Sequence, residues 1–178
     1  DLTTLPADFV PGSNYVLTGP EASTRAGQDG WGDTRYTERY RLAWRRMIAF
    51  NTERSLFATL IAPGPAHVHA VHSLAFPDVV LTALAAGFFS SLPLDYFLRI
   101  SGRADLQPGE VRLMPAPEMD HPLASALLLR MARLNCLTRA YSSMWSNLYR
   151  ESWRSDRWAV KWPGLPSISE VGPRWATD

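Results

Sequence analysis

The chain has 178 residues, a formal net charge of +1 and a single cysteine, Cys136. The length suits one domain with one hydrophobic core, and the near-zero charge excludes a protein with a uniformly basic surface. The lone cysteine excludes an internal disulfide framework and favours a cytoplasmic protein, and no apolar run reaches the roughly 18 to 20 residues of a membrane-spanning helix.

Residues 1–32 are rich in Pro, Gly, Ser and Thr. This composition predicts irregular structure, with one short strand at Asn14–Leu17. The segment has no clear structured beginning, and we therefore expect the chain to be part of a longer protein.

Three strand-like runs follow, and together they predict an antiparallel meander. In the first, Tyr40–Ala49, apolar and basic side chains alternate. Residues 51–54 predict a turn, and the second strand, Leu56–Ala62, ends at Pro63-Gly64-Pro65. The third strand covers Val68–Phe76.

Apolar residues at helical spacing begin after Pro77, a residue that suits a first helical turn. We expect one helix at Asp78–Ser91, broken by Pro93. A second helix is predicted at Leu94–Ser101 and ends at Gly102.

The second half begins with a predicted short strand at Val111–Met114, followed by the longest predicted helix, from His121 to about Arg150. The elements predict an α+β fold, with an antiparallel or mixed sheet in the N-terminal half and packed helices in the C-terminal half. Residues 152–178 form a tail with four tryptophans that we expect to dock onto the domain or a neighbouring protein: Trp153, Trp158, Trp162 and Trp175.

Arginines are concentrated around the predicted hairpin, at residues 35–54, whereas Lys161 is the only lysine. Arg41 and Arg45 lie on one face of the first strand, roughly 13 Å apart at about 3.3 Å per residue, a spacing that suits separated phosphates or base edges. We predict that this hairpin binds double-stranded DNA through residues of its first strand and its turn: Arg41, Arg45, Arg46, Asn51, Thr52 and Arg54.

Structural explanations for the same arginines remain open. A GC-rich genome would raise the arginine content of the whole chain. The hairpin would then be a solvated face with local ion pairs such as Glu38–Arg41 and Glu53–Arg54. In addition, Arg46 shares its strand parity with Trp44 and Ile48, so the alternative for this residue is a buried and paired guanidinium in place of a DNA contact.

Recognisable catalytic motifs are absent from the sequence. His67 and His69 share one strand face with His72 nearby, but the carboxylate or cysteine partners of a metal site are missing, which favours hydrogen-bonded histidines. Cys136 falls in an apolar helical pattern that predicts a buried thiol. No nucleophile elbow or phosphate-binding loop is present, so we predict no catalytic residue, metal or cofactor in this chain.

The order of the motifs resembles the target-recognition region of Eco57I-like type II restriction–modification enzymes and related phage-defence DNA methyltransferases. In that family an Arg-rich strand precedes an Asn-x-Glu-Arg turn and an Ile-x-Pro-Gly stop, matched here by Arg45-Arg46, Asn51-Thr52-Glu53-Arg54 and Ile61-Ala62-Pro63-Gly64. A second block extends the resemblance over about residues 35–151, with Ser91, Leu94-Asp95, Arg99 and Leu113-Met114-Pro115-Ala116-Pro117.

This resemblance implies N6-adenine methylation of DNA with S-adenosylmethionine. The family's Asn/Asp-Pro-Pro-Tyr/Phe signature and Gly-rich cofactor loop do not occur here. The chain would then supply specificity, and a catalytic methyltransferase domain of the same parent chain would bind the cofactor and flip out the adenine. Whether the parent also cleaves DNA stays open.

The resulting expectation is an irregular segment at 1–32, a target-recognition domain at 33–151 and a Trp- and Pro-rich tail at 152–178. Two alternatives stay open, a protein-interaction module of a larger complex and a His-based metalloenzyme.

Overall fold

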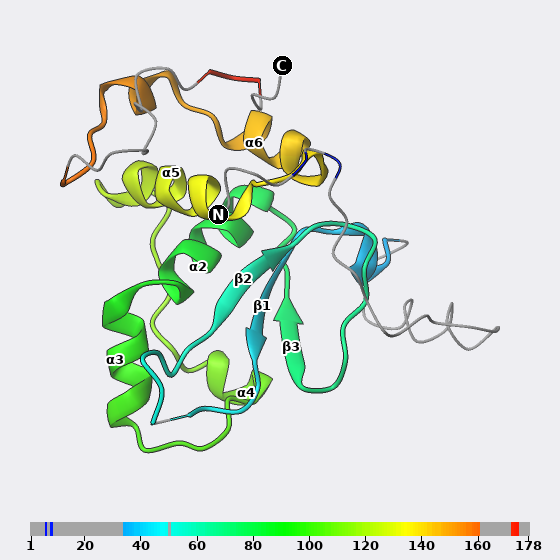
Figure 1. Cartoon of the computed structure of the whole chain (residues 1–178), viewed down its shortest axis with the longest axis vertical. Helices are drawn as coiled ribbons and strands as arrows, with labels where there is room; N and C mark the ends of the chain where they lie inside the picture. The colour runs from blue at the N-terminus through cyan, green and yellow to red at the C-terminus, as the bar shows by residue number, and fades with distance from the viewer. Residues whose placement is uncertain (1–5, 7, 9–33, 50, 161–171, 175–178) are drawn as a thin grey trace.

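The computed structural model describes residues 6, 8, 34–49, 51–160 and 172–174. Within them a three-stranded antiparallel sheet occupies the N-terminal half, and helices occupy most of the C-terminal half (Figure 1). This arrangement confirms the predicted α+β class. The strand predicted at Asn14–Leu17 and the tail residues Trp162 and Trp175 lie outside the described residues.

The sheet consists of β1 (Arg41–Arg45), β2 (Ala58–Ile61) and β3 (Val71–Leu74), in the order β2-β1-β3. The antiparallel pairing of β1 with β2 was predicted, and it sets Leu42 opposite Leu60. The predicted meander is wrong, because β3 pairs with β1 and sets Leu74 opposite Leu42 from the other side. Four of the five β1 residues are buried, as expected for a central strand rather than an edge strand.

Residues 63–70 carry the chain from β2 past β1 to β3. Gly64 adopts a left-handed backbone with φ of 112°, a conformation that glycine reaches without a Cβ clash. Its N–H donates to the carbonyl of Thr37 at 2.7 Å, which ties this connection to the turn η2 (Tyr36–Glu38). The connection therefore crosses the end of the sheet instead of turning tightly back along β2.

The first two long helices are α2 (Val79–Phe89) and α3 (Leu92–Ile100). Asp78 caps α2 by accepting the N–H of Val80 at 2.7 Å, so Pro77 precedes the cap instead of entering the first turn. Ser91 caps α3, which begins two residues before the predicted start and contains Pro93 in its first turn. Gly102, with φ of 67°, follows α3 as predicted.

A short helix, α4 (Pro108–Val111), stands where the sequence predicted a strand at Val111–Met114, and that prediction is wrong. Proline at its first position and a capping box favour the helix. In that capping box the backbone N–H of Gln107 donates to the Glu110 carboxylate at 2.8 Å.

The long helix predicted from His121 to Arg150 is two helices, α5 (Ala124–Asn135) and α6 (Ser142–Leu148), with the turn η3 (Arg139–Tyr141) between them. The break follows Asn135, whose side chain bonds backbone groups on two elements. Its Oδ1 accepts the N–H of Leu60 in β2 at 3.0 Å, and its Nδ2 donates to the Met131 carbonyl at 3.0 Å. Asn135 thus fixes the end of α5 against the sheet.

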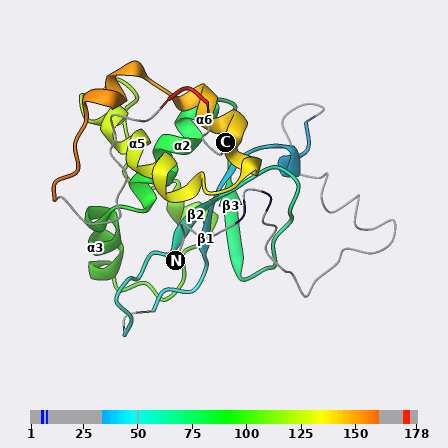
Figure 2. The same cartoon turned by 45° about the horizontal axis from the view of Figure 1, so that its top comes forward.

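Helix α2 lies between the sheet and α5, and α6 packs against both α2 and α5 (Figure 2). The approach of α2 to α5 is close because Gly87 has no Cβ, and a Cβ there would lie 3.0 Å from Leu127 Cγ. Among the described residues no single helix is long and apolar enough to span a membrane; α2 and α3 pass that test only as a pair, bent by 62°.

The first part of the tail packs onto α5 and α6. Trp153, in the turn η4 (Glu151–Ser155), is buried, and its indole N–H donates to Ser125 Oγ at 3.1 Å. Its ring meets those of Trp145 and Tyr149 edge to face. Arg130 of α5 pairs with Asp156, which attaches the chain beyond η4 to the same helix.

Candidate nucleic-acid interface

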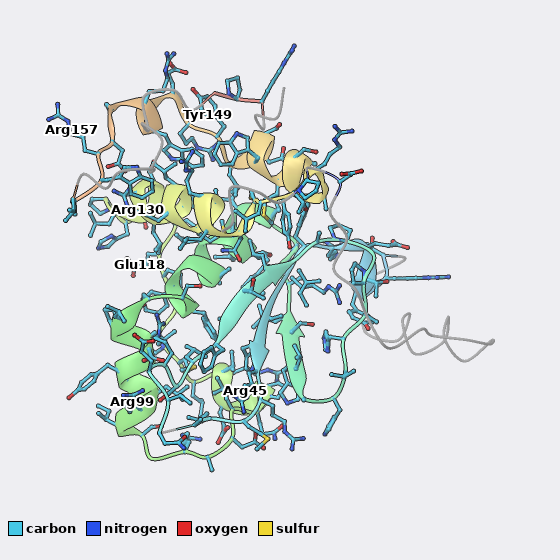
Figure 3. The ribbon with its side chains drawn as sticks, viewed as in Figure 1. Arg45, Arg99, Glu118, Arg130, Tyr149 and Arg157 are labelled. Atoms are coloured by element: carbon cyan, nitrogen blue, oxygen red, sulfur yellow. The ribbon has the colours of Figure 1, made fainter. Side chains whose placement is uncertain are left out.

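Arg41 and Arg45 leave β1 on the same side, but their environments differ. Arg41 is 1% exposed, whereas Arg45 is exposed and stands at the end of β1 near α4 (Figure 3). The Arg41 guanidinium lies over the ring of Tyr36 at 4.9 Å and donates from Nη2 to the carbonyl of Pro65. Arg41 therefore faces the interior, and Arg45 is the β1 arginine that solvent or DNA can reach.

Arg46 is engaged by the chain that returns from α3. Its Nε lies 3.3 Å from Asp105 Oδ1, and its Nη1 lies 2.5 Å from His69 Nε2. The backbone adds support, because the N–H of Leu106 donates to the Arg46 carbonyl at 2.8 Å. The pairing given as the alternative for Arg46 is present, with Asp105 as the partner, but the burial that went with it is not, because the Arg46 side chain is partly exposed.

Residues 51–54 are held against α3 instead of forming a free tip. Arg54 pairs with Asp95 at 3.4 Å, and its Nη2 donates to the carbonyl of Ser90 at 3.1 Å. Thr52 uses its hydroxyl within the same segment, donating to the Arg54 carbonyl at 2.5 Å. Asn51 and Thr52 remain exposed to solvent, and Arg54 is partly covered.

Two side chains of α3 provide the attachment, which we call the α3 latch and define as Asp95 and Arg99. Asp95 Oδ1 accepts the backbone N–H of Ser55 at 2.8 Å and that of Leu56 at 2.6 Å. Arg99 donates to the carbonyl of Thr52 at 2.7 Å and to Ser55 Oγ at 3.0 Å (Figure 3). The latch fixes the course of the chain immediately before β2.

The electrostatics of the latch favour an ionised Asp95. Burial raises the pKa of this carboxyl, but the hydrogen bonds from Leu56 and Ser55 and the charge of Arg54 outweigh burial and leave the pKa below its ordinary value. Neither Asp95 nor Asp105 was singled out in the sequence as an arginine partner. An acid placed within an apolar helix, four residues before Arg99, was the available signal for Asp95.

The ion pairs of the described residues do not include the local pairs Glu38–Arg41 and Glu53–Arg54 that the sequence left open. Instead, Arg46 and Arg54 are neutralised by carboxylates far away in sequence. Of the six residues predicted to contact DNA, Arg45, Asn51 and Thr52 present exposed side chains.

The histidines and the cysteine that the sequence singled out occupy different environments in the part of the chain that the structure describes. No cluster of three or more His, Cys, Asp or Glu side chains there is arranged to hold a metal ion. His67 instead lies 2.7 Å from Ser73 Oγ through its Nε2. Cys136 is buried as predicted, and burial raises the pKa of its thiol to about 12, which suppresses the reactive thiolate.

No family model, curated protein or solved structure matches this chain. The resemblance to target-recognition regions therefore stays a prediction from the sequence motifs. The geometry adds that the exposed basic group on the predicted hairpin is Arg45, accompanied by the polar residues Asn51 and Thr52.

Proposed function

We propose that this chain is the DNA target-recognition domain of a restriction–modification or phage-defence DNA methyltransferase that acts in the cytoplasm. It binds duplex DNA and presents an adenine to a catalytic domain of the same parent protein. That catalytic domain holds S-adenosylmethionine and performs the N6 methylation.

The observation that carries the proposal is the exposure of Arg45 at the end of the central strand, on a ribbon whose position is fixed by the α3 latch. A guanidinium held on a rigid element is suited to bonding phosphate oxygens or a guanine edge with two parallel donors. Asn51 and Thr52 add exposed polar groups on the segment between β1 and β2. We assign Arg46 and Arg54 the structural role of holding residues 46–54 through Asp105 and Asp95, and we assign no DNA contact to Arg41, which is buried.

The proposal predicts that Arg45→Ala weakens binding to duplex DNA about fivefold, which corresponds to roughly 1 kcal/mol. The slope of log affinity against log salt falls by about 1, because one fewer counterion is released. Fluorescence anisotropy of a labelled duplex at several salt concentrations measures both quantities.

Arg157→Ala is the matched control, since Arg157 is exposed at the opposite end of the molecule from Arg45 (Figure 3). Arg45→Lys distinguishes a purely electrostatic phosphate contact from a two-pronged hydrogen bond. Lysine keeps the charge and therefore the salt slope, but it lacks the planar guanidinium with its two parallel donors. Equal losses of DNA affinity for Arg45→Ala and Arg157→Ala would show that the surface around Arg45 is not the DNA-binding surface. A wild-type chain that shows no salt-dependent DNA binding would exclude the function.

A second candidate function, protein interaction, is favoured by the outer face of α3. Large apolar side chains stand exposed along it, and we call this set the α3 stripe: Leu92, Tyr96, Phe97 and Ile100. Single exposed apolar residues are ordinary, whereas several along one helix form a patch of the kind that protein partners cover.

If the α3 stripe binds a second copy of the chain, Ile100→Glu shifts the wild-type dimer to monomer in sedimentation equilibrium. Burying a carboxylate in an apolar contact is costly, so we expect the dimer to weaken at least tenfold. Leu113→Glu is the control, since Leu113 is 80% exposed and lies outside α3. A wild-type chain that stays monomeric at high concentration would rule out self-association through the stripe.

A further inference from the structure

A cavity of about 880 Å³ lies beside β3, at the edge of the sheet. Residues from both faces of β3 line it, Ser73 on one face and His72 and Leu74 on the other, so the cavity reaches around this strand. Apolar side chains of α2 and of residues 108–117 form a second wall. Its volume falls in the range of pockets that hold small organic ligands.

The charged groups that the described residues place on the cavity wall are all of one sign. Arg39, Arg41 and Arg112 line it together with His67 and His72, and no aspartate or glutamate is among the described residues of the lining. A cavity lined in this way attracts anions, and its apolar walls keep that attraction strong by lowering the local dielectric constant.

Arg41 is the most constrained of these cations. It is 1% exposed, and Nη2 bonds the Pro65 carbonyl, but Nε and Nη1 are buried without a hydrogen-bond partner among the described residues. His72 also lines the cavity, and its buried Nε2 has no hydrogen-bond partner among the described residues. Buried donors are normally satisfied, and a buried charge normally has a counter-charge.

Deprotonation does not relieve this unpaired charge. Burial lowers the pKa of the Arg41 guanidinium, an effect that Tyr36 partly opposes. Arginine nevertheless keeps its proton in proteins, because its intrinsic pKa is so high. The described carboxylates do not supply a counter-charge, since none of the ion pairs formed by the described residues includes Arg41.

We propose that this cavity binds a small organic anion, with a carboxylate or phosphate head on Arg41 and an apolar body against the wall formed by α2 and residues 108–117. The negative head forms a charge-assisted hydrogen bond with the Arg41 guanidinium, whose Nε and Nη1 have no hydrogen-bond partner among the described residues. The site is separate from the proposed DNA surface, since Arg45 does not line the cavity.

Calorimetric titration of the full chain with two pairs of probes tests the proposal. The pairs are 4-phenylbutyrate with its neutral analogue 4-phenylbutanol, and adenosine 5′-monophosphate with adenosine. We expect at least one anion to bind ten or more times more tightly than its neutral partner. The pair that shows the preference distinguishes a carboxylate ligand from a phosphate ligand.

Arg41→Met replaces the buried charge with an apolar chain of similar length and should abolish the preference for the anion. Its thermal midpoint without ligand should stay equal to that of the wild type or rise, because replacing a buried charge with a packed apolar group is often stabilising. Arg112→Gln, an exposed change on the cavity wall, should weaken anion binding about threefold, and Arg157→Met should leave it unchanged.

Equal binding of the charged and neutral probes would overturn the proposal, and this comparison needs no variant. Anion binding retained in Arg41→Met would also overturn it. If Arg41→Met does not fold, Arg112→Gln decides, and an unchanged affinity there counts against the site. Because Arg45→Ala should leave probe binding intact, failure of the DNA proposal and failure of this one are distinguishable.

Discussion

Trp44→Ala should lower the free energy of unfolding by about 4 kcal/mol, as expected for removing a large aromatic side chain from a core. Trp44 is 1% exposed and lies in the central strand of the sheet. Its ring centroid is 6.0 Å from that of Phe89 in α2, and its indole N–H donates to the Leu106 carbonyl at 3.0 Å. The residue therefore joins β1, α2 and the segment that returns from α3. Urea unfolding followed by circular dichroism measures the change.

Trp44→Phe separates packing from the hydrogen bond. Phenylalanine keeps a ring against Phe89 but leaves the Leu106 carbonyl without its donor, so we expect a loss of about 1 to 2 kcal/mol. Met47→Ala is the exposed comparison in the same segment, since Met47 is 56% exposed, and it should cost less than about 1 kcal/mol. A loss for Trp44→Ala no larger than that for Met47→Ala would show that the core does not depend on this ring.

The sequence pattern predicted those helices and strands whose formation and ends depend on residues nearby in the sequence. Alternation placed β1, and a strand-like run that ends at Pro63-Gly64-Pro65 placed β2. The positions of Asp78 and Gly102 bounded helices, because caps and left-handed glycines act locally. Strand order was not encoded in the same way. Periodicity says which side chains share a face, but it does not say whether β3 pairs with β2 or with β1.

The break between α5 and α6 also depends on a tertiary contact that periodicity does not reveal. The apolar spacing continues through residues 136–141, and a single helix satisfied it. What ends α5 is the side chain of Asn135, which turns to the N–H of Leu60 in β2. A partner this distant in sequence exists only once the sheet and the helix have packed together.

The arginines show most clearly what a sequence pattern does not predict, namely the environment of a side chain in the folded protein. Parity placed Arg41 and Arg45 on one face of β1, and they are on one face, but Tyr36 and residue 65 cover Arg41 and leave Arg45 exposed. The pairing of charges was also set by the fold. Nearby glutamates were the plausible partners in sequence, whereas packing brought Asp95 to Arg54.

Asp95→Ala should destabilise the protein by about 3 kcal/mol, the range observed when one member of a buried charged network is removed. The variant leaves the backbone N–H groups of Ser55 and Leu56 buried without their acceptor, and it leaves Arg54 without its carboxylate. Asp95→Asn retains one acceptor oxygen and should lose about half as much. Asp120→Ala, which removes an exposed carboxylate, should change stability by less than about 0.5 kcal/mol.

The pH dependence of the loss of stability in Asp95→Asn distinguishes the contribution of the Asp95 charge from that of its size and shape. Because the pKa of this carboxyl is lowered in the folded protein, its contribution is fully present above the ordinary value of 3.8. It is lost as the pH falls through the folded pKa, where the native carboxylate also takes up a proton. The difference between wild type and Asp95→Asn should therefore be constant from pH 7 to about pH 5 and shrink below pH 4.

Urea unfolding of both proteins across this range measures the effect. A difference that stays constant down to pH 3 would mean that packing, and not the ionised carboxylate, holds residues 52–56 to α3. A loss for Asp95→Ala as small as that for Asp120→Ala would mean that the α3 latch does not stabilise the fold. In that case the ribbon that carries Arg45 would not be held rigid for binding.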